Sequence, residues 1–138
     1  MEERAENSEQ EHLILKARGS EDIQMLVAMV SLGMCRALAD GAVRPEYACA
    51  RLFGPALLTR MQRLPARHPL IDAVHVATEL EDVANLVPDA FEGAIQDLED
   101  HLLRVVRSLA DLADGEKWLA PTGTRTAQMA QRGLPEER

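Results

Sequence analysis

The last third of the chain carries an apolar repeat that constrains its fold more than any other pattern in the sequence. Its members alternate in steps of four and three: Phe91, Ile95, Leu98, Leu102, Val105, Leu109 and Leu112. This spacing puts every member on one face of an α-helix, whereas a strand would divide them between its two faces. We therefore expect a helix from about Asp89 to Leu112, whose apolar seam serves antiparallel packing on another helix or dimerisation.

A second periodic stretch, from Leu70 to Val87, predicts a central helix that ends before Pro88. Its apolar positions step by three and four: Ala73, Val76, Leu80, Val83 and Val87, with Leu70, Val74, Ala77 and Ala84 widening the face. The polar positions left over are Asp72, His75, Glu79 and Asp82. Helical spacing puts these four groups on one side, so they form either the solvated edge of a central helix or a site.

The most apolar stretch follows Ser20, which we expect to cap the start of a helix that runs to about Ala39 and ends at Gly41. One stripe of this helix contains Ile23, Leu26, Val27, Val30, Met34 and Leu38. A helix this apolar lies in the centre of the core, or half of it is covered by another subunit. Its uncharged run, from Ile23 to Cys35, is too short to span a bilayer.

Between these stretches, Pro45 and Gly54-Pro55 mark two short helices, over about 45–52 and 56–64. The sequence thus predicts an all-α domain at 19–115, a compact bundle of four to five helices with the central and last helices antiparallel. A flexible arm at 1–18 precedes it, and a mobile tail at 116–138 follows it. Residues 12–17 form a short strand or an extended arm, which pairs with a second copy or lies on the helices.

Charge is distributed unevenly along this acidic chain, whose net charge is -8. This balance argues against free nucleic acid or an anionic membrane as a partner. Acids concentrate in a segment that we call the acidic lobe: Glu79, Glu81, Asp82, Asp89, Glu92, Asp97, Glu99 and Asp100. The acidic lobe either faces the arginines of 51–67 within the fold or binds a basic protein partner.

Cysteine usage and the N-terminal residues indicate a reduced, cytoplasmic protein. Cys35 and Cys49 do not make a disulfide framework, and neither has a His or a second Cys at metal-ligand spacing. The first residues, MEERAENSEQE, are polar and acidic, unlike a secretory signal. We expect no cofactor.

Three functions are compatible with these observations. The leading one is an acidic protein-interaction module, with an immunity or inhibitor protein against a basic partner such as a nuclease toxin as one form. The first alternative is a small metal-binding or hydrolytic enzyme that uses His75 with Asp72, Glu79 or Asp82, although the predicted helical domain at 19–115 has no Glu-x-x-His pair and the chain has no Gly-x-Ser-x-Gly. The second is a homodimeric structural protein, paired through the Ile23–Leu38 helix or the Phe91–Leu112 seam.

A longer pattern resembles a family of small bacterial proteins of unknown function. An apolar helix leads into ALADGAVRPEYACARLF, and HVATELEDVANLV then precedes a proline turn and a last helix. The matching positions are His75, Glu79, Leu80, Glu81 and Asp82, with Pro88 at the turn. The resemblance covers about Ser20 to Leu112 and implies the limits of the domain, but it transfers no activity.

Overall fold

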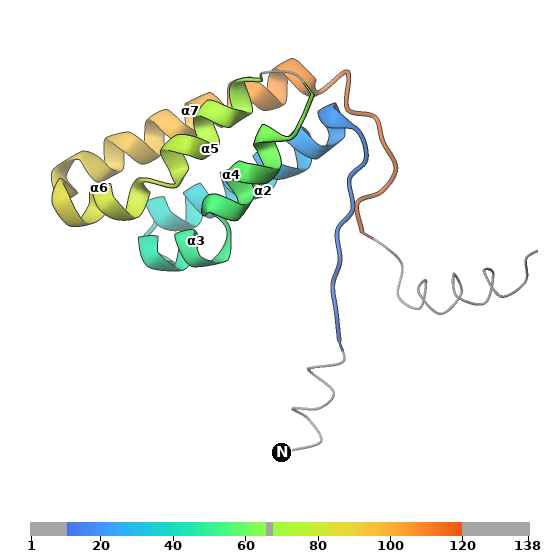
Figure 1. Cartoon of the computed structure of the whole chain (residues 1–138). Helices are drawn as coiled ribbons and strands as arrows, with labels where there is room; N and C mark the ends of the chain where they lie inside the picture. Colours follow the sequence, from blue (N-terminus) through green and yellow to red (C-terminus); the bar gives the residue numbers. More distant parts are fainter. Residues whose placement is uncertain (1–10, 66–67, 120–138) are drawn as a thin grey trace, which may run out of the picture. The chain divides into compact units, whose positions relative to one another are not determined.

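The computed structural model describes residues 11–65 and 68–119. Its helices follow one another in the order α2 (Ser20–Ala39), α3 (Pro45–Arg51), α4 (Pro55–Gln62), α5 (Pro69–Ala77), α6 (Leu80–Leu86), the 3₁₀ helix η1 (Pro88–Ala90) and α7 (Phe91–Leu109) (Figure 1). This confirms the all-α class. The described residues hold six α-helices rather than four or five, because the expected central helix is divided and both short helices form.

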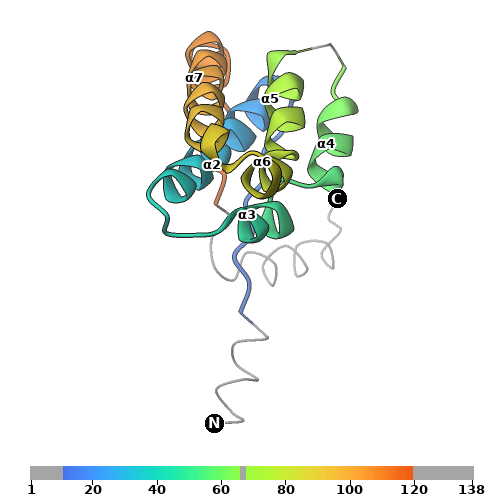
Figure 2. The same ribbon diagram turned by 90° about the vertical axis from the view of Figure 1, so that its left-hand side faces the viewer.

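Helix α7 runs antiparallel to both α2 and α5 and packs most extensively on α2 (Figures 1 and 2). Five members of its apolar repeat are buried: Ile95, Leu98, Leu102, Val105 and Leu109. Phe91 is partly buried, and Leu112 lies beyond the end of the helix with 61% of its surface exposed. The seam is therefore used inside the domain and is not free to form a dimer.

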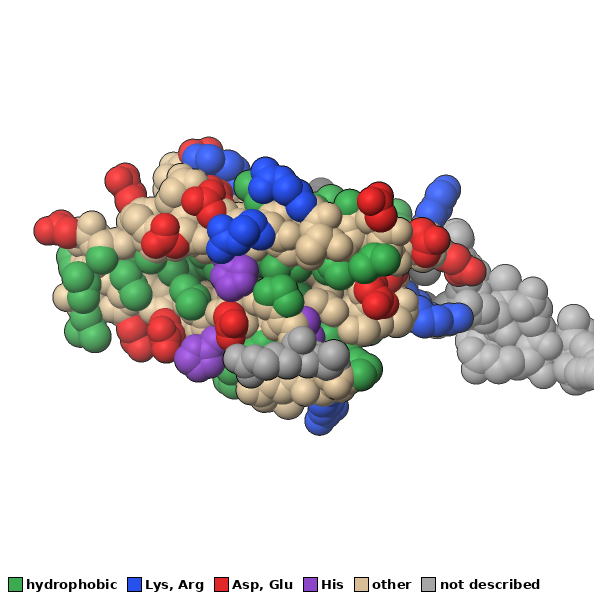
Figure 3. Space-filling view, turned by 90° about the horizontal axis from the view of Figure 1, so that it is seen from above, with side chains coloured by type: hydrophobic (Ala, Val, Ile, Leu, Met, Phe, Trp, Pro, Cys, Tyr) green, Lys and Arg blue, Asp and Glu red, His purple; other side chains and the backbone are tan. Residues whose placement is uncertain are grey.

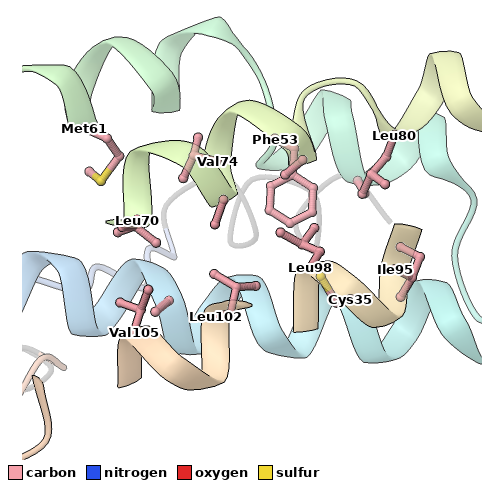
Figure 4. Close-up of a cluster of buried hydrophobic side chains, with 14 of the residues drawn as sticks. Cys35, Phe53, Met61, Leu70, Val74, Leu80, Ile95, Leu98, Leu102 and Val105 are labelled. Carbon is pink, nitrogen blue, oxygen red and sulfur yellow. The ribbon is translucent and has the colours of Figure 1, made fainter. Parts of the chain in front are cut away.

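One aliphatic cluster fills the space between α2, α5 and α7 (Figure 4). Phe53, from the turn between α3 and α4, points into the same cluster as Leu80 and Leu98. Next to the cluster, His68 is buried at the start of α5, where its Nε2 lies 3.1 Å from the carbonyl oxygen of Met61. The α4–α5 connection is thus tied to the core by a polar contact as well as by packing.

The buried face of α2 differs from the predicted stripe. The buried positions of α2 are Asp22, Gln24, Ala28, Ser31, Cys35 and Leu38. Of the predicted stripe only Leu38 is fully buried, and Val30 keeps 41% of its surface exposed. The helix is turned about a quarter of a turn from the expected orientation. The small side chains of Ala28, Ser31 and Cys35 let α2 approach α7 closely, which a face of larger residues would prevent.

The central helix is the second correction. It breaks at Thr78 and Glu79, so α5 and α6 bury different sides. Leu70, Ala73, Val74 and Ala77 form the buried side of α5, whereas Val76, predicted to be in the core, is 43% exposed. The Thr78 hydroxyl donates to the His75 carbonyl oxygen at 2.6 Å, and the Glu79 amide bonds to Val76 instead of continuing the α-helical pattern.

Helix ends follow local sequence signals closely. Gly41 has a φ of 75°, and the amides of Gly41 and Ala42 bond to the carbonyl oxygens of Leu38 and Ala37, which closes α2 in a Schellman motif. The prolines at 45, 55, 69 and 88 each begin a helix, as N1 residues do. Ser20 is not the N-cap, because Gly19 takes that position and the Ser20 hydroxyl accepts a bond from Gln24 at 3.0 Å.

The chain divides into two units, 18–115 and a second unit made of 1–17 with 116–138. Within the described part of the second unit, Leu15 and Leu119 form an isolated antiparallel bridge, and the Lys16 amide donates to the Trp118 carbonyl oxygen at 2.7 Å. The predicted N-terminal arm therefore pairs with the start of the C-terminal segment, and as a single bridge rather than a strand. The remainder of the predicted tail, 120–138, lies outside the described residues.

Helix α2 is long and apolar enough, by length and composition alone, to cross a membrane, and it is the one helix of the described residues that meets this test. The core helix of a water-soluble protein and a signal sequence near an N-terminus both meet the same test. In this structure α2 packs along α7 and buries the polar side chains of Gln24 and Ser31 there.

Candidate functional site

Acidic side chains gather at the end of the helical unit where α6, η1 and α7 meet. Figure 3 shows them on either side of a strip of apolar side chains at this end. Six of the eight acidic-lobe residues are exposed, and Glu81 and Glu99 are half-buried. The lobe does not form a single face, because its members lie on α6, on η1 and around α7.

A groove between α2 and α7 collects some of these acids with residues that the sequence did not single out. We call it the α2–α7 groove, and its volume is about 640 Å³. Its polar lining consists of Arg36, Asp40, Glu92, Gly93, Gln96 and Glu99. Steps of four and three place Glu92, Gln96 and Glu99 on the side of α7 that faces α2.

An apolar pocket of about 340 Å³ adjoins the groove at the same end of the unit. Leu38, Gly41 and Phe91 line both hollows, so the two are continuous. Its other walls come from the α2–α3 turn, α6 and η1: Val43, Arg44, Pro45, Ala84 and Pro88. The Schellman turn at Gly41 and the break at Pro88 thus shape the pocket, since each ends a helix at its rim.

Charges in the groove are only partly balanced. Arg36 donates to Asp40 at 2.8 Å in an exposed ion pair, and this hydrogen bond, the Asp40 charge and, after them, the Glu99 charge raise the pKa of Arg36. Glu92 and Glu99 form no ion pair within the described part of the chain. The Glu99 carboxylate lies close enough to affect Cys35, whose pKa is raised to about 12 by burial first and by Glu99 second. Among the described residues, the two carboxylates therefore border the groove with no cation at ion-pair distance, and Glu99 interacts with the Arg36 charge from further away.

The other predicted partner-binding residues lie outside the groove. Asp97 and Asp100 are one residue beyond Gln96 and Glu99, a rotation of about 100° away from α2. Asp100 accepts a hydrogen bond from Gln96 at 3.2 Å. Glu81 and Asp82 lie in the first turn of α6, and their charges contribute to the raised pKa of Cys49, after burial as the main cause. Asp89 follows Pro88 at the pocket rim, and Glu79 is the N-cap of α6.

The candidate metal ligands Asp72, His75 and Glu79 do not converge. His75 Nδ1 and Glu79 Oε2 are 3.8 Å apart, and both side chains are more than half exposed. Among residues 11–65 and 68–119, no three His, Cys, Asp or Glu side chains are grouped as metal ligands would be. The break at Thr78 also moves Asp82 onto a different helix from His75, so the predicted four-residue polar stripe is not continuous.

Comparison with known proteins identifies a family. A family described as "Protein of unknown function (DUF3969)" matches residues 18–120. The chain belongs to the DUF3969 family. The match covers the whole helical unit, including the α2–α7 groove and its adjoining pocket. It confirms the expected resemblance to a family of unknown function.

No curated protein and no solved structure matches the chain. The DUF3969 domain must therefore be interpreted from its own geometry. Sequence reasoning identified Glu92 and Glu99 from the charge pattern. It missed Arg36, Asp40, Gly93 and Gln96, because these residues become neighbours only when α2 packs antiparallel on α7.

Proposed function

We propose that this DUF3969 domain is a cytoplasmic protein-interaction module that binds a basic segment of a partner protein in the α2–α7 groove. An immunity or inhibitor protein against a basic partner is one form of such a module. The observation that carries the proposal is the position of Glu92 and Glu99, two carboxylates that form no ion pair with any described residue and lie beside an apolar pocket. A basic side chain near the carboxylates and an apolar side chain in the pocket would satisfy both.

The two halves of the site have different physical roles. Carboxylates exposed at the surface mainly raise the association rate and favour cationic partners. The apolar pocket, walled by Leu38, Val43 and Phe91, is where a buried anchor residue would supply most of the affinity. Gly93 adds space, since a Cβ built on it meets no atom within 4 Å. Partner backbone can therefore approach α7 closely at this point.

Charge reversal inside the groove tests the proposal. The native chain, a Glu92→Lys and Glu99→Lys variant, and a control with Asp97→Lys and Asp111→Lys are each used to capture proteins from a lysate of the source organism. The control changes the net charge by the same amount on exposed residues outside the groove. We expect the native chain and the control to capture the same basic protein and the groove variant to lose it by at least about tenfold.

Two results would contradict the proposal. Equal loss in both variants would mean that only the overall charge matters, and equal capture by both would exclude the groove. Filling the groove with Gly93→Leu provides an uncharged test of the same surface. It should weaken capture while leaving the circular dichroism spectrum unchanged, because the new side chain extends into open space.

A further inference from the structure

The outward face of α2 is apolar and is covered by no described element of the helical unit. Met29 and Val30 are 46% and 41% exposed, and Gly33, about one turn further along the helix, is exposed as well. Leu26 and Ala37 extend the same face at helical spacing. No charged residue interrupts α2 from Ile23 to Cys35. The basic partner of the proposed function would find no carboxylate on this uncharged face. We therefore expect a different molecule to cover it.

Gly33 is the second observation on this face. Glycine in the interior of a helix is less stable than alanine by about 1 kcal/mol. Nothing inside the helical unit explains it, since a Cβ built on Gly33 meets no atom within 4 Å and its φ is not positive. A glycine on an exposed apolar helix face allows another helix to come close. The site opposite Gly33 thus suits a protruding side chain.

The spacing along α2 makes this face self-complementary. Consider an antiparallel pair of α2 helices centred between Met29 and Val30. Two residues then lie opposite each other across the pair when their numbers add up to 59, as 29 and 30 do. Leu26 of one copy then lies opposite Gly33 of the other, and this contact occurs twice. A two-fold axis packs a surface against its own copy. The surface must therefore carry both a protruding residue and a recess that receives it.

Charge selects the antiparallel direction. The first turn of α2 contains the exposed Glu21, whereas its last turn contains Arg36. A parallel pair would bring the acids of both copies together, and an antiparallel pair separates them by the length of the helix. The helix dipoles oppose each other only in the antiparallel arrangement.

We propose that a second copy of this chain covers the outward face of α2, with the two α2 helices antiparallel and Leu26 of each seated over Gly33 of the other. This homodimer leaves the α2–α7 groove as a separate site and does not depend on the proposed function. A single helix pair is at the small end of specific interfaces, so we expect a dimer that dissociates on dilution.

Replacing Gly33 tests the dimer without threatening the fold. Sedimentation equilibrium of the full chain over a concentration series should give a mass of twice 15.2 kDa at high concentration. Gly33→Leu should fold, since its side chain enters open space and leucine favours a helix, but dimerise at least about tenfold more weakly because it fills the hole for Leu26. Gly93→Leu, the same change at an open position of α7, is the matched control and should dimerise as the native chain does.

The readouts separate this inference from the proposed function. Gly33→Leu should capture the basic partner as the native chain does, whereas Gly93→Leu should capture it more weakly. A native chain that stays monomeric throughout the series would overturn the dimer, and co-flotation of that monomer with lipid vesicles would identify a membrane as the occupant instead. An unchanged dimer in folded Gly33→Leu would equally overturn it.

Discussion

At the scale of single residues, this domain buries side chains that are small or polar. Cys35 has no exposed surface, and burial raises its pKa from 9.0 to about 12. Its neighbour on the same face, Ser31, is 1% exposed and its hydroxyl has no hydrogen-bond partner among the described residues. Such positions keep small side chains because the approach of α7 leaves no room for larger ones, and they hold their polar atoms at some cost in stability.

The raised pKa of Cys35 predicts a loss of stability in alkaline solution. Below 9.0 the thiol is protonated in both states. Between 9.0 and about 12 the unfolded chain releases a proton that the folded chain retains, so the free energy of unfolding decreases as pH rises. Urea unfolding at one pH below 9.0 and one within this interval should show that decrease in the native chain and a smaller one in Cys35→Ala. Equal decreases in the two proteins would contradict the prediction.

At the scale of elements, α7 organises the unit through one buried face. Adjacent leucines on this helix have opposite environments, with Leu102 2% exposed and Leu103 37% exposed. The helix therefore distinguishes its buried and open sides within one residue, as its seven-residue repeat predicted.

These two leucines give a matched pair of substitutions. Leu102→Ala should lower the free energy of unfolding by about 2–5 kcal/mol, because it leaves a cavity in the core. Leu103→Ala, the same chemical change on the open side, should lower it by less than about 1 kcal/mol. Chemical denaturation measures both losses in unfolding free energy, with one common slope of that free energy against denaturant concentration used for all three proteins. Similar losses for the two variants would mean that the buried face of α7 has been assigned wrongly.

Element prediction succeeded where the signals were local. The repeat in α7, the prolines at N1 and the turn at Gly41 each depend on residues close in sequence, and each was confirmed. The break between α5 and α6 has no glycine or proline to announce it. It depends on the Thr78 hydroxyl and on packing by α3, where the Cys49 thiol lies 3.9 Å from the Ala77 carbonyl oxygen. Sequence periodicity does not report contacts of that kind.

At the scale of the whole molecule, the net charge of -8 acts on the two proposed associations in opposite ways. Attraction of a basic partner to the groove is electrostatic, so it should weaken as salt is added. Self-association of an acidic chain through an uncharged helix face meets repulsion between copies, which salt screens. Partner capture and dimer mass measured over one salt series should therefore change in opposite directions. A parallel decrease of both would contradict the division into two surfaces.

Only part of the candidate site could be predicted from the sequence. Charge counting found the acidic end and two of its important carboxylates, Glu92 and Glu99. It did not separate them from Asp97 and Asp100, because the pairing of α2 with α7 decides which side of α7 borders the groove. The orientation of α2 was mispredicted for the same reason, since its buried face is the one with the smaller residues.

The rotated orientation of α2 has a practical consequence for anyone who redesigns this domain. On most helices the large apolar residues are the ones to keep. On α2 the positions to keep are the small, buried ones. Enlarging Ala28 or Ser31 to improve an apparently weak core would wedge the two longest helices apart. Met29 and Val30 lie at the centre of the proposed dimer interface, so a solubilising residue placed at either position should leave the subunit folded and keep it monomeric.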